Sequence, residues 1–90
     1  MNMGKAPKDL DLKSLRKDGG QYIKNLRLEA GLTQRELSDK IGMPYYTFIS
    51  QIESGNAKLN PSFYEKAALA FGVEPKIFVK KMSFQYRNER

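Results

Sequence analysis

The chain has 90 residues, a length that fits one domain. It has neither cysteine nor histidine, which excludes disulfides and zinc sites built from these residues and removes the usual general acid–base side chain. No apolar run reaches the roughly 20 residues of a membrane span, and the first ten residues lack the apolar stretch of a signal peptide. We therefore expect a cytoplasmic protein that uses no metal, cofactor or membrane. Without a glycine-rich phosphate loop or clustered carboxylates, the sequence does not predict an enzyme.

The net charge of +6 lies in the two ends of the chain. Residues 1–18 carry five cations against three acids, residues 19–75 carry six of each sign, and residues 76–90 carry five cations against one acid. A basic excess suits a polyanionic partner such as nucleic acid. A soluble protein with charged tails would have the same composition, so charge alone leaves both interpretations open.

Paired glycines, Gly19-Gly20, are expected to separate a basic, mobile N-terminal segment (1–18) from a compact domain (19–82). A first helix follows the glycines and ends at Gly31. Its apolar residues recur at helical spacing: Tyr22, Ile23, Leu26 and Ala30.

The run Thr33-Gln34-Arg35-Glu36 is a capping box that predicts the start of a second helix. Leu37 and Ile41 supply the buried face of this helix, and a glycine ends it. Pro44 suits the first turn of a third helix. The apolar stripe expected for that helix is Tyr45, Phe48, Ile49 and Ile52.

Asn60-Pro61 predicts the start of a fourth helix, an N-cap followed by proline at the first helical position. A fifth helix is expected to open at Pro75, with Phe78 and Met82 inward. The residues expected to line the fourth helix are Tyr64, Ala67, Ala68 and Phe71. No alternating pattern typical of strands persists, so the predicted fold class is all-α, a compact bundle of five short helices.

The third helix has an outward face in which every residue carries a hydrogen-bonding group and none is charged. Lysine and glutamate usually fill a face that is only solvated, so the pattern favours contact with base edges in a major groove. There, glutamine pairs with adenine and threonine touches a thymine methyl group. The residues of this face are Tyr46, Thr47, Ser50, Gln51 and Ser54.

Three segments in this order, LRLEAGLTQREL (26–37), ISQIESG (49–55) and AFGV (70–73), resemble the Cro/repressor-type (Xre-like) helix-turn-helix family. The resemblance spans roughly residues 20–80 and implies a helix-turn-helix protein that binds double-stranded DNA. It implies base contacts by Tyr46, Thr47 and Gln51, and phosphate contacts by Gln34, Asn56 and Lys58. We add Ser50 of the same outward face to the expected base contacts, and Thr33 and Tyr45 to the expected phosphate contacts. It also implies a buried structural ion pair between Arg27 and Glu53.

The chain departs from the usual family spacing in one place. Six residues (43–48) lie between Gly42 and Ile49, one more than usual, so the turn or the first turn of the third helix must absorb the extra residue. Whether Tyr45 or Tyr46 makes the first base contact therefore stays open.

The two ends allow two interpretations each. The N-terminal segment is either a mobile tail or a basic arm that lies along the DNA backbone or in a minor groove. In the basic C-terminal tail (83–90), Phe84 and Tyr86 either cover the domain's own surface or pack against a second copy. We favour the second copy, because family members commonly bind palindromes as dimers.

Together these features predict a sequence-specific transcriptional regulator associated with the nucleoid, a repressor that acts as a homodimer on a palindromic operator. An antitoxin that binds both DNA and a toxin is one alternative. An activator that meets polymerase through Glu36 and Asp39 is another. A protein-interaction module that has lost DNA binding is the third.

Overall fold

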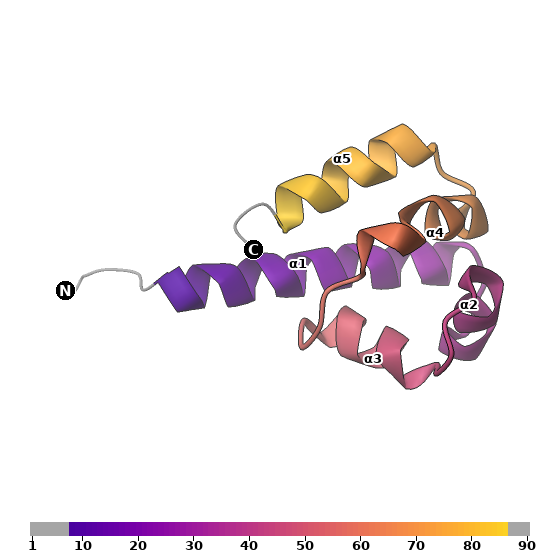
Figure 1. The fold of residues 1–90 in the computed structure, drawn as a ribbon, viewed down its shortest axis with the longest axis horizontal. Coiled ribbons are helices and arrows are strands. Elements are labelled where there is room, and N and C mark those ends of the chain that lie inside the picture. Colours follow the sequence, from indigo (N-terminus) through magenta and orange to yellow (C-terminus); the bar gives the residue numbers. More distant parts are fainter. Residues whose placement is uncertain (1–7, 87–90) are drawn as a thin grey trace.

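The computed structural model describes residues 8–86, with the side chains of residues 13–86. Within this part of the chain all regular structure is helical, as the sequence predicts, and no helix is long and apolar enough to cross a membrane. Figure 1 shows α1 lying between α5 on one side and α3 on the other, with α2 and α4 at one end of the molecule. The elements are α1 (Lys8–Glu29), α2 (Gln34–Ile41), α3 (Thr47–Ser54), the 3-10 turn η1 (Pro61–Phe63), α4 (Tyr64–Phe71) and α5 (Pro75–Gln85).

The chain break predicted at Gly19-Gly20 is wrong, because α1 continues through both glycines. Both residues are buried, and a Cβ atom on Gly20 would lie 2.3 Å from the carbonyl oxygen of Ile52 in α3. The glycines therefore allow α3 to approach the backbone of α1 rather than ending a helix. Residues 8–18, expected as part of a separate segment, are the first half of α1 and project beyond the other helices (Figure 1). Residues 1–7 lie outside the described part of the chain.

The helix starts follow the local signals in the sequence. The Thr33 hydroxyl accepts a hydrogen bond from the Glu36 N–H at 3.0 Å, and the Glu36 carboxylate accepts one from the Thr33 N–H at 2.8 Å. This confirms the capping box at the start of α2. The Asn60 side chain likewise accepts from the Ser62 N–H at 2.9 Å, but Pro61 opens the single turn η1 and α4 follows it.

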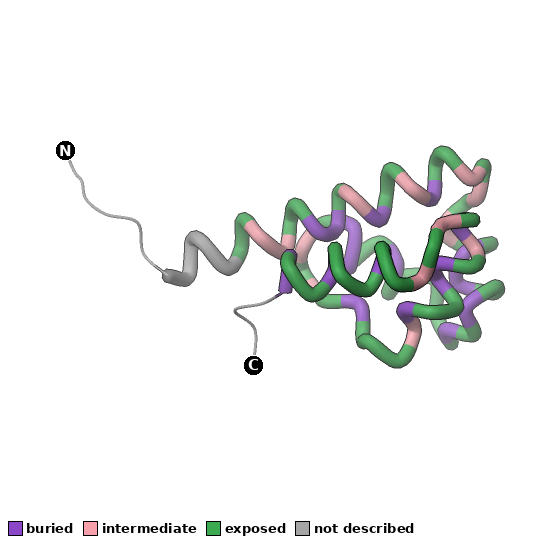
Figure 2. The backbone as a smooth tube through the Cα atoms, turned by 90° about the horizontal axis from the view of Figure 1, so that it is seen from above, coloured by how far each residue is buried: buried purple, intermediate pink, exposed green. Residues whose placement is uncertain are grey.

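The centre of the core is Phe78 of α5, which is completely buried. The rings of Tyr22, Tyr64 and Phe71 surround it with centroids 5.8–6.0 Å away, so they join α5 to α1 and α4. Figure 2 shows buried residues recurring along the second half of α1, where the other helices pack against it. The predicted core positions on α4 and α5 are all buried: Tyr64, Ala67, Ala68, Phe71, Phe78 and Met82.

Two predictions about the third helix are wrong. Pro44 lies in the turn rather than in the first helical turn, because α3 begins at Thr47. Of the expected apolar stripe, Ile49 and Ile52 are buried, whereas Tyr45 is 66% exposed and Phe48 is 46% exposed. The later start places Tyr45 outside the helix and Phe48 on its flank.

Tyr86, expected at an interface with a second copy, is buried within its own chain. Its hydroxyl accepts a hydrogen bond from the Leu59 N–H at 3.2 Å, and its ring lies against Gly19 of α1. That expectation is therefore wrong for Tyr86, since a partner for its ring and hydroxyl already exists inside the domain. Phe84 differs, with 55% of its surface exposed. Residues 87–90 of the predicted tail lie outside the described part of the chain.

Candidate nucleic-acid interface

The turn between α2 and α3 is fixed from both sides. Gly42 adopts a left-handed conformation (φ 77°), which lets its N–H and that of Met43 bond back to carbonyls of α2. The buried Ser38 hydroxyl donates to the Met43 carbonyl at 3.1 Å, and the Met43 side chain lies in the core. Because the turn is held by both hydrogen bonds and packing, the direction in which α3 leaves it is set.

The turn itself absorbs the extra residue, since α3 begins only at Thr47. The Arg35 guanidinium lies over the Tyr46 ring, 4.4 Å from its centroid, so Tyr46 packs against α2. Tyr45 meets Phe48 edge to face at 5.9 Å, beside α3. Both tyrosines line one hollow at the start of α3, together with Arg35 and Thr47.

The outward face of α3 consists of exposed, uncharged polar residues. Successive residues of an α-helix are rotated by about 100°. Since Ile49, Ile52 and Glu53 are buried, this rotation directs Thr47, Gln51 and Ser54 away from the core, with Ser50 and Phe48 on the two flanks. All four candidate base-contacting residues (Tyr46, Thr47, Ser50, Gln51) are exposed.

Arg27 and Glu53 form the ion pair that the resemblance implies. The Arg27 Nε lies 2.6 Å from Glu53 Oε2, its Nη2 donates to Oε1 at 3.1 Å, and its Nη1 donates to the Leu32 carbonyl at 2.8 Å. Both side chains are buried. The pair joins α1, α3 and the loop before α2, so it holds the helices that present the polar face.

Gln34, the first residue of α2, lies beside this pair. Its Nε2 donates a hydrogen bond to Glu53 Oε1 at 3.1 Å. An amide side chain has a second N–H and an acceptor oxygen. Gln34 can therefore bind a phosphate while Glu53 fixes its position, next to the backbone N–H groups at the start of α2. Thr33, at the same helix end, is exposed.

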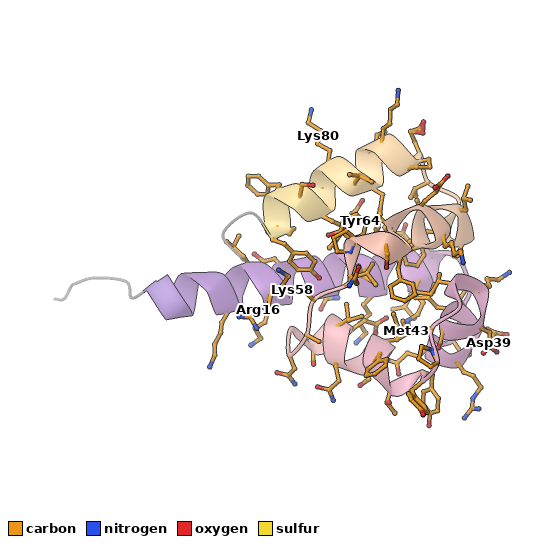
Figure 3. All side chains as sticks on the ribbon, viewed as in Figure 1. Arg16, Asp39, Met43, Lys58, Tyr64 and Lys80 are labelled. Carbon is orange, nitrogen blue, oxygen red and sulfur yellow. The ribbon has the colours of Figure 1, made fainter. Side chains whose placement is uncertain are left out.

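Two candidate phosphate-binding side chains in the loop after α3, Asn56 and Lys58, lie on different sides of the loop. Asn56 is exposed directly beyond α3, and its N–H donates to the Gln51 carbonyl at 2.9 Å. The Lys58 ammonium instead lies 5.5 Å from the Tyr86 ring centroid, on the side of the loop that faces α5 (Figure 3). The structure thus groups Thr33, Gln34 and the face of α3, and places Lys58 apart from them.

Sequence analysis missed three residues of α1 that border this surface, namely Lys17, Gln21 and Lys24. They line one hollow together with Gln34 and with Ser50 and Ser54 of α3. Their spacing of four and three residues would place them on one side of a helix, and this pattern could have been recognised in the sequence. The break wrongly expected at Gly19-Gly20 assigned Lys17 and Lys24 to different segments and concealed it.

Two comparisons with known proteins bear on this surface. A search of curated proteins finds no match to the chain. A model of the helix-turn-helix family matches residues 23–78, more than half of the chain, from the second half of α1 to the start of α5. The chain therefore belongs to the Cro/C1-type (Xre-like) helix-turn-helix family, whose members are DNA-binding transcription regulators.

Proposed function

We propose that the protein is a repressor that binds a palindromic operator as a dimer, with α3 in the major groove of each half-site. The observation that carries this proposal is the uncharged, exposed face of α3, formed by Thr47, Gln51 and Ser54. An uncharged face of this kind suits A·T base pairs in particular, where an amide pairs with adenine and a methyl group meets the thymine methyl.

The roles of the candidate residues follow from their chemistry. The Gln51 amide offers a donor and an acceptor side by side, which matches the paired groups on adenine, and Thr47 offers a methyl and a hydroxyl group. Gln34 and the N–H groups at the start of α2 suit phosphate oxygens, which position the domain without selecting a sequence. Specificity therefore comes from α3 and orientation from α2.

Two exposed apolar side chains on one side of α5 support the dimer. Ile77 and Phe84 are seven residues apart, two helical turns, and are 64% and 55% exposed. Large apolar side chains gathered on one helix side suit contact with an identical surface on a second copy. A twofold dimer of this kind matches half-sites roughly one DNA turn apart.

The capping box supports a repressor over an activator. Glu36, one of the two acids considered for contact with polymerase, holds the Thr33 N–H at 2.8 Å. Asp39 is exposed on α2 (Figure 3), but one carboxylate is a small surface for recruiting a polymerase. A repressor that blocks a promoter by occupying its DNA needs only the DNA contacts proposed above.

The proposal is tested by selecting duplexes from a random library with the full chain and measuring their affinity at several salt concentrations. We expect an inverted repeat bound by two protomers, with log affinity falling linearly with log salt. Transcription from a promoter that carries the selected repeat should decrease when the protein is added. Lack of affinity for every duplex at low salt would refute DNA binding. A single half-site bound by one protomer would refute the dimer, and increased transcription would refute the repressor.

A further inference from the structure

A hollow of about 370 Å³ lies between α1 and α3, beside the polar face of α3. Two cations, Lys17 and Lys24, line it from α1. The acid that lines it, Glu53, is neutralised by Arg27 at 2.6 Å. The hollow therefore carries a net positive charge from its two lysines. The residues that line it are Lys17, Gln21, Lys24, Gln34, Ser50, Glu53 and Ser54.

The position of Lys17 relative to α3 is fixed by close packing. A Cβ atom on Gly55, the residue that ends α3, would lie 2.7 Å from Lys17 Cγ and 3.0 Å from Lys17 Cα. The stem of Lys17 thus rests on the end of α3, a usual arrangement for a lysine whose ammonium remains in water. Lys24 lies two turns further along the same side of α1, past Gln21, at the end nearer Gln34.

Neither lysine is committed to an acidic partner within the described part of the chain, where both side chains are exposed. The rise of about 1.5 Å per residue separates them by about 10 Å along α1, so each can take a separate phosphate. The Ser50 hydroxyl and the Gln21 amide, which keeps a second N–H beside the one it donates to Asn25, add uncharged hydrogen-bond donors. Two cations with neutral donors between them suit a strand of backbone phosphates.

We propose that this hollow binds backbone phosphates of the DNA strand that borders the groove occupied by α3, with Lys17 and Lys24 each contacting one phosphate. The inference rests on the proposed function, since it requires α3 in a major groove. It extends the DNA contact surface along α1 to Lys17 and Gln21, which precede the region matched by the family model (23–78). Lys17, near the end of the first half of α1, thereby becomes part of the DNA-binding surface.

A purely structural role for the lysines makes a different prediction. Lys17 lies at the C-terminal end of α3, where a cation stabilises the helix dipole. If that were its whole role, replacing it would lower the stability of the fold and leave the salt dependence of DNA binding unchanged. Stability and DNA affinity must therefore be measured on the same variants.

The test compares two double variants of the full chain that lose the same charge. Lys17→Gln/Lys24→Gln removes the lysines of the hollow. The control, Lys66→Gln/Lys76→Gln, removes two exposed lysines, one on α4 and one at the start of α5, which line neither the hollow nor the side of α5 between Ile77 and Phe84. Affinity for the selected duplex and for a random duplex is titrated against salt. Each lost phosphate contact lowers the log–log slope by about 0.9.

We expect the hollow variant to lose about 1.8 from the slope for each bound protomer, about 3.6 for a dimer, on both duplexes, while the control variant keeps the wild-type slope. Thermal melting of both variants should match the wild type. Equal slopes for the two variants would overturn the inference while leaving the proposed function intact. A wild-type protein with no salt-dependent DNA affinity would overturn both.

Phosphate ethylation gives a second readout. Some phosphates whose ethylation weakens DNA binding by the wild type should have no effect on binding by Lys17→Gln/Lys24→Gln. We expect these phosphates to lie next to those whose ethylation no longer affects binding by Gln34→Ala. An interference pattern identical in wild type and hollow variant would contradict the assignment.

Discussion

Gly20 of α1 and Ile52 of α3 lie so close that a Cβ atom on Gly20 would be 2.3 Å from the Ile52 carbonyl oxygen. Alanine in a helix is favoured over glycine by about 0.5–1 kcal/mol, but overpacking against backbone typically costs about 1–3 kcal/mol or more. We therefore expect Gly20→Ala to lower the free energy of unfolding, measured by urea denaturation, and to weaken DNA binding by shifting α3.

Gly19→Ala is the matched control, because it adds the same methyl group one residue earlier. There the new Cβ would meet a ring carbon of Tyr86 at 3.2 Å and the Gln85 Cβ at 3.3 Å, contacts that require a shift of only a few tenths of an ångström. Its effect should be clearly smaller. Equal losses in the two variants would show that the approach of α3 is not what requires Gly20.

This contact also explains what the sequence could not predict. The starts of α2 and η1 were predictable because Thr33 and Asn60 act on N–H groups two or three residues away. Paired glycines either end a helix or allow another helix to pack closely against the backbone. The second possibility depends on residues of α3, which are distant in the sequence. Local signals alone therefore placed the break at Gly19-Gly20.

The candidate interface shows the same division. The face of α3 was predictable because its uncharged polar residues recur at helical spacing within one helix. Tyr45 and Phe48 were wrongly assigned to the core. Most buried residues are apolar, but apolar residues are also common on protein surfaces, so apolar character alone does not establish burial. The lysine-lined hollow could not be predicted, since it forms only when α1 and α3 pack together.

Removing one member of the Arg27–Glu53 pair should cost more than removing both. Arg27→Met leaves the Glu53 carboxylate buried without its counter-charge, which typically costs about 3–5 kcal/mol. Arg27→Met/Glu53→Met replaces both with apolar side chains and should recover most of that loss. Chemical denaturation of the two variants and the wild type measures this. A double variant as unstable as Arg27→Met would contradict the interpretation.

Thr47→Ala and Gln51→Ala should weaken binding to the selected operator and leave binding to a random duplex nearly unchanged. Both side chains lie on the exposed face of α3, and a good base contact is worth about 1–3 kcal/mol. Titrations on the two duplexes at one salt concentration measure the ratio. Ser62→Ala, on η1 away from α3, is a suitable control. Equal losses on both duplexes would mean that these residues do not contact bases.

Gln34→Ala should weaken binding to both duplexes, because a phosphate contact carries no sequence information. A hydrogen bond to a charged group is worth about 1.5–3 kcal/mol. The log–log salt slope should stay at the wild-type value, since glutamine carries no charge, in contrast to the lysines of the hollow. Gln34 also donates to Glu53, so the melting temperature must be measured alongside. A changed base preference would contradict a phosphate role.

Tyr64 should make the fold sensitive to alkaline pH. Burial, together with repulsion from Tyr86, raises the pKa of the Tyr64 hydroxyl from about 10 to about 12. Below pH 10 both folded and unfolded chains hold this proton, and the contribution to stability is complete. Between pH 10 and 12 the unfolded chain releases the proton first, so the free energy of unfolding decreases as the pH rises.

Tyr64→Phe removes the titrating group and should give a shallower decrease in stability than the wild type across that interval. Tyr45→Phe, at a ring that is 66% exposed, loses a hydroxyl outside the core and should follow the wild-type curve. Urea denaturation at several pH values from 9 to 12 measures all three proteins, and the difference between curves cancels the lysines that titrate in the same range. If Tyr64→Phe and wild type lose stability in parallel, burial of the Tyr64 hydroxyl does not control the alkaline limit of the fold.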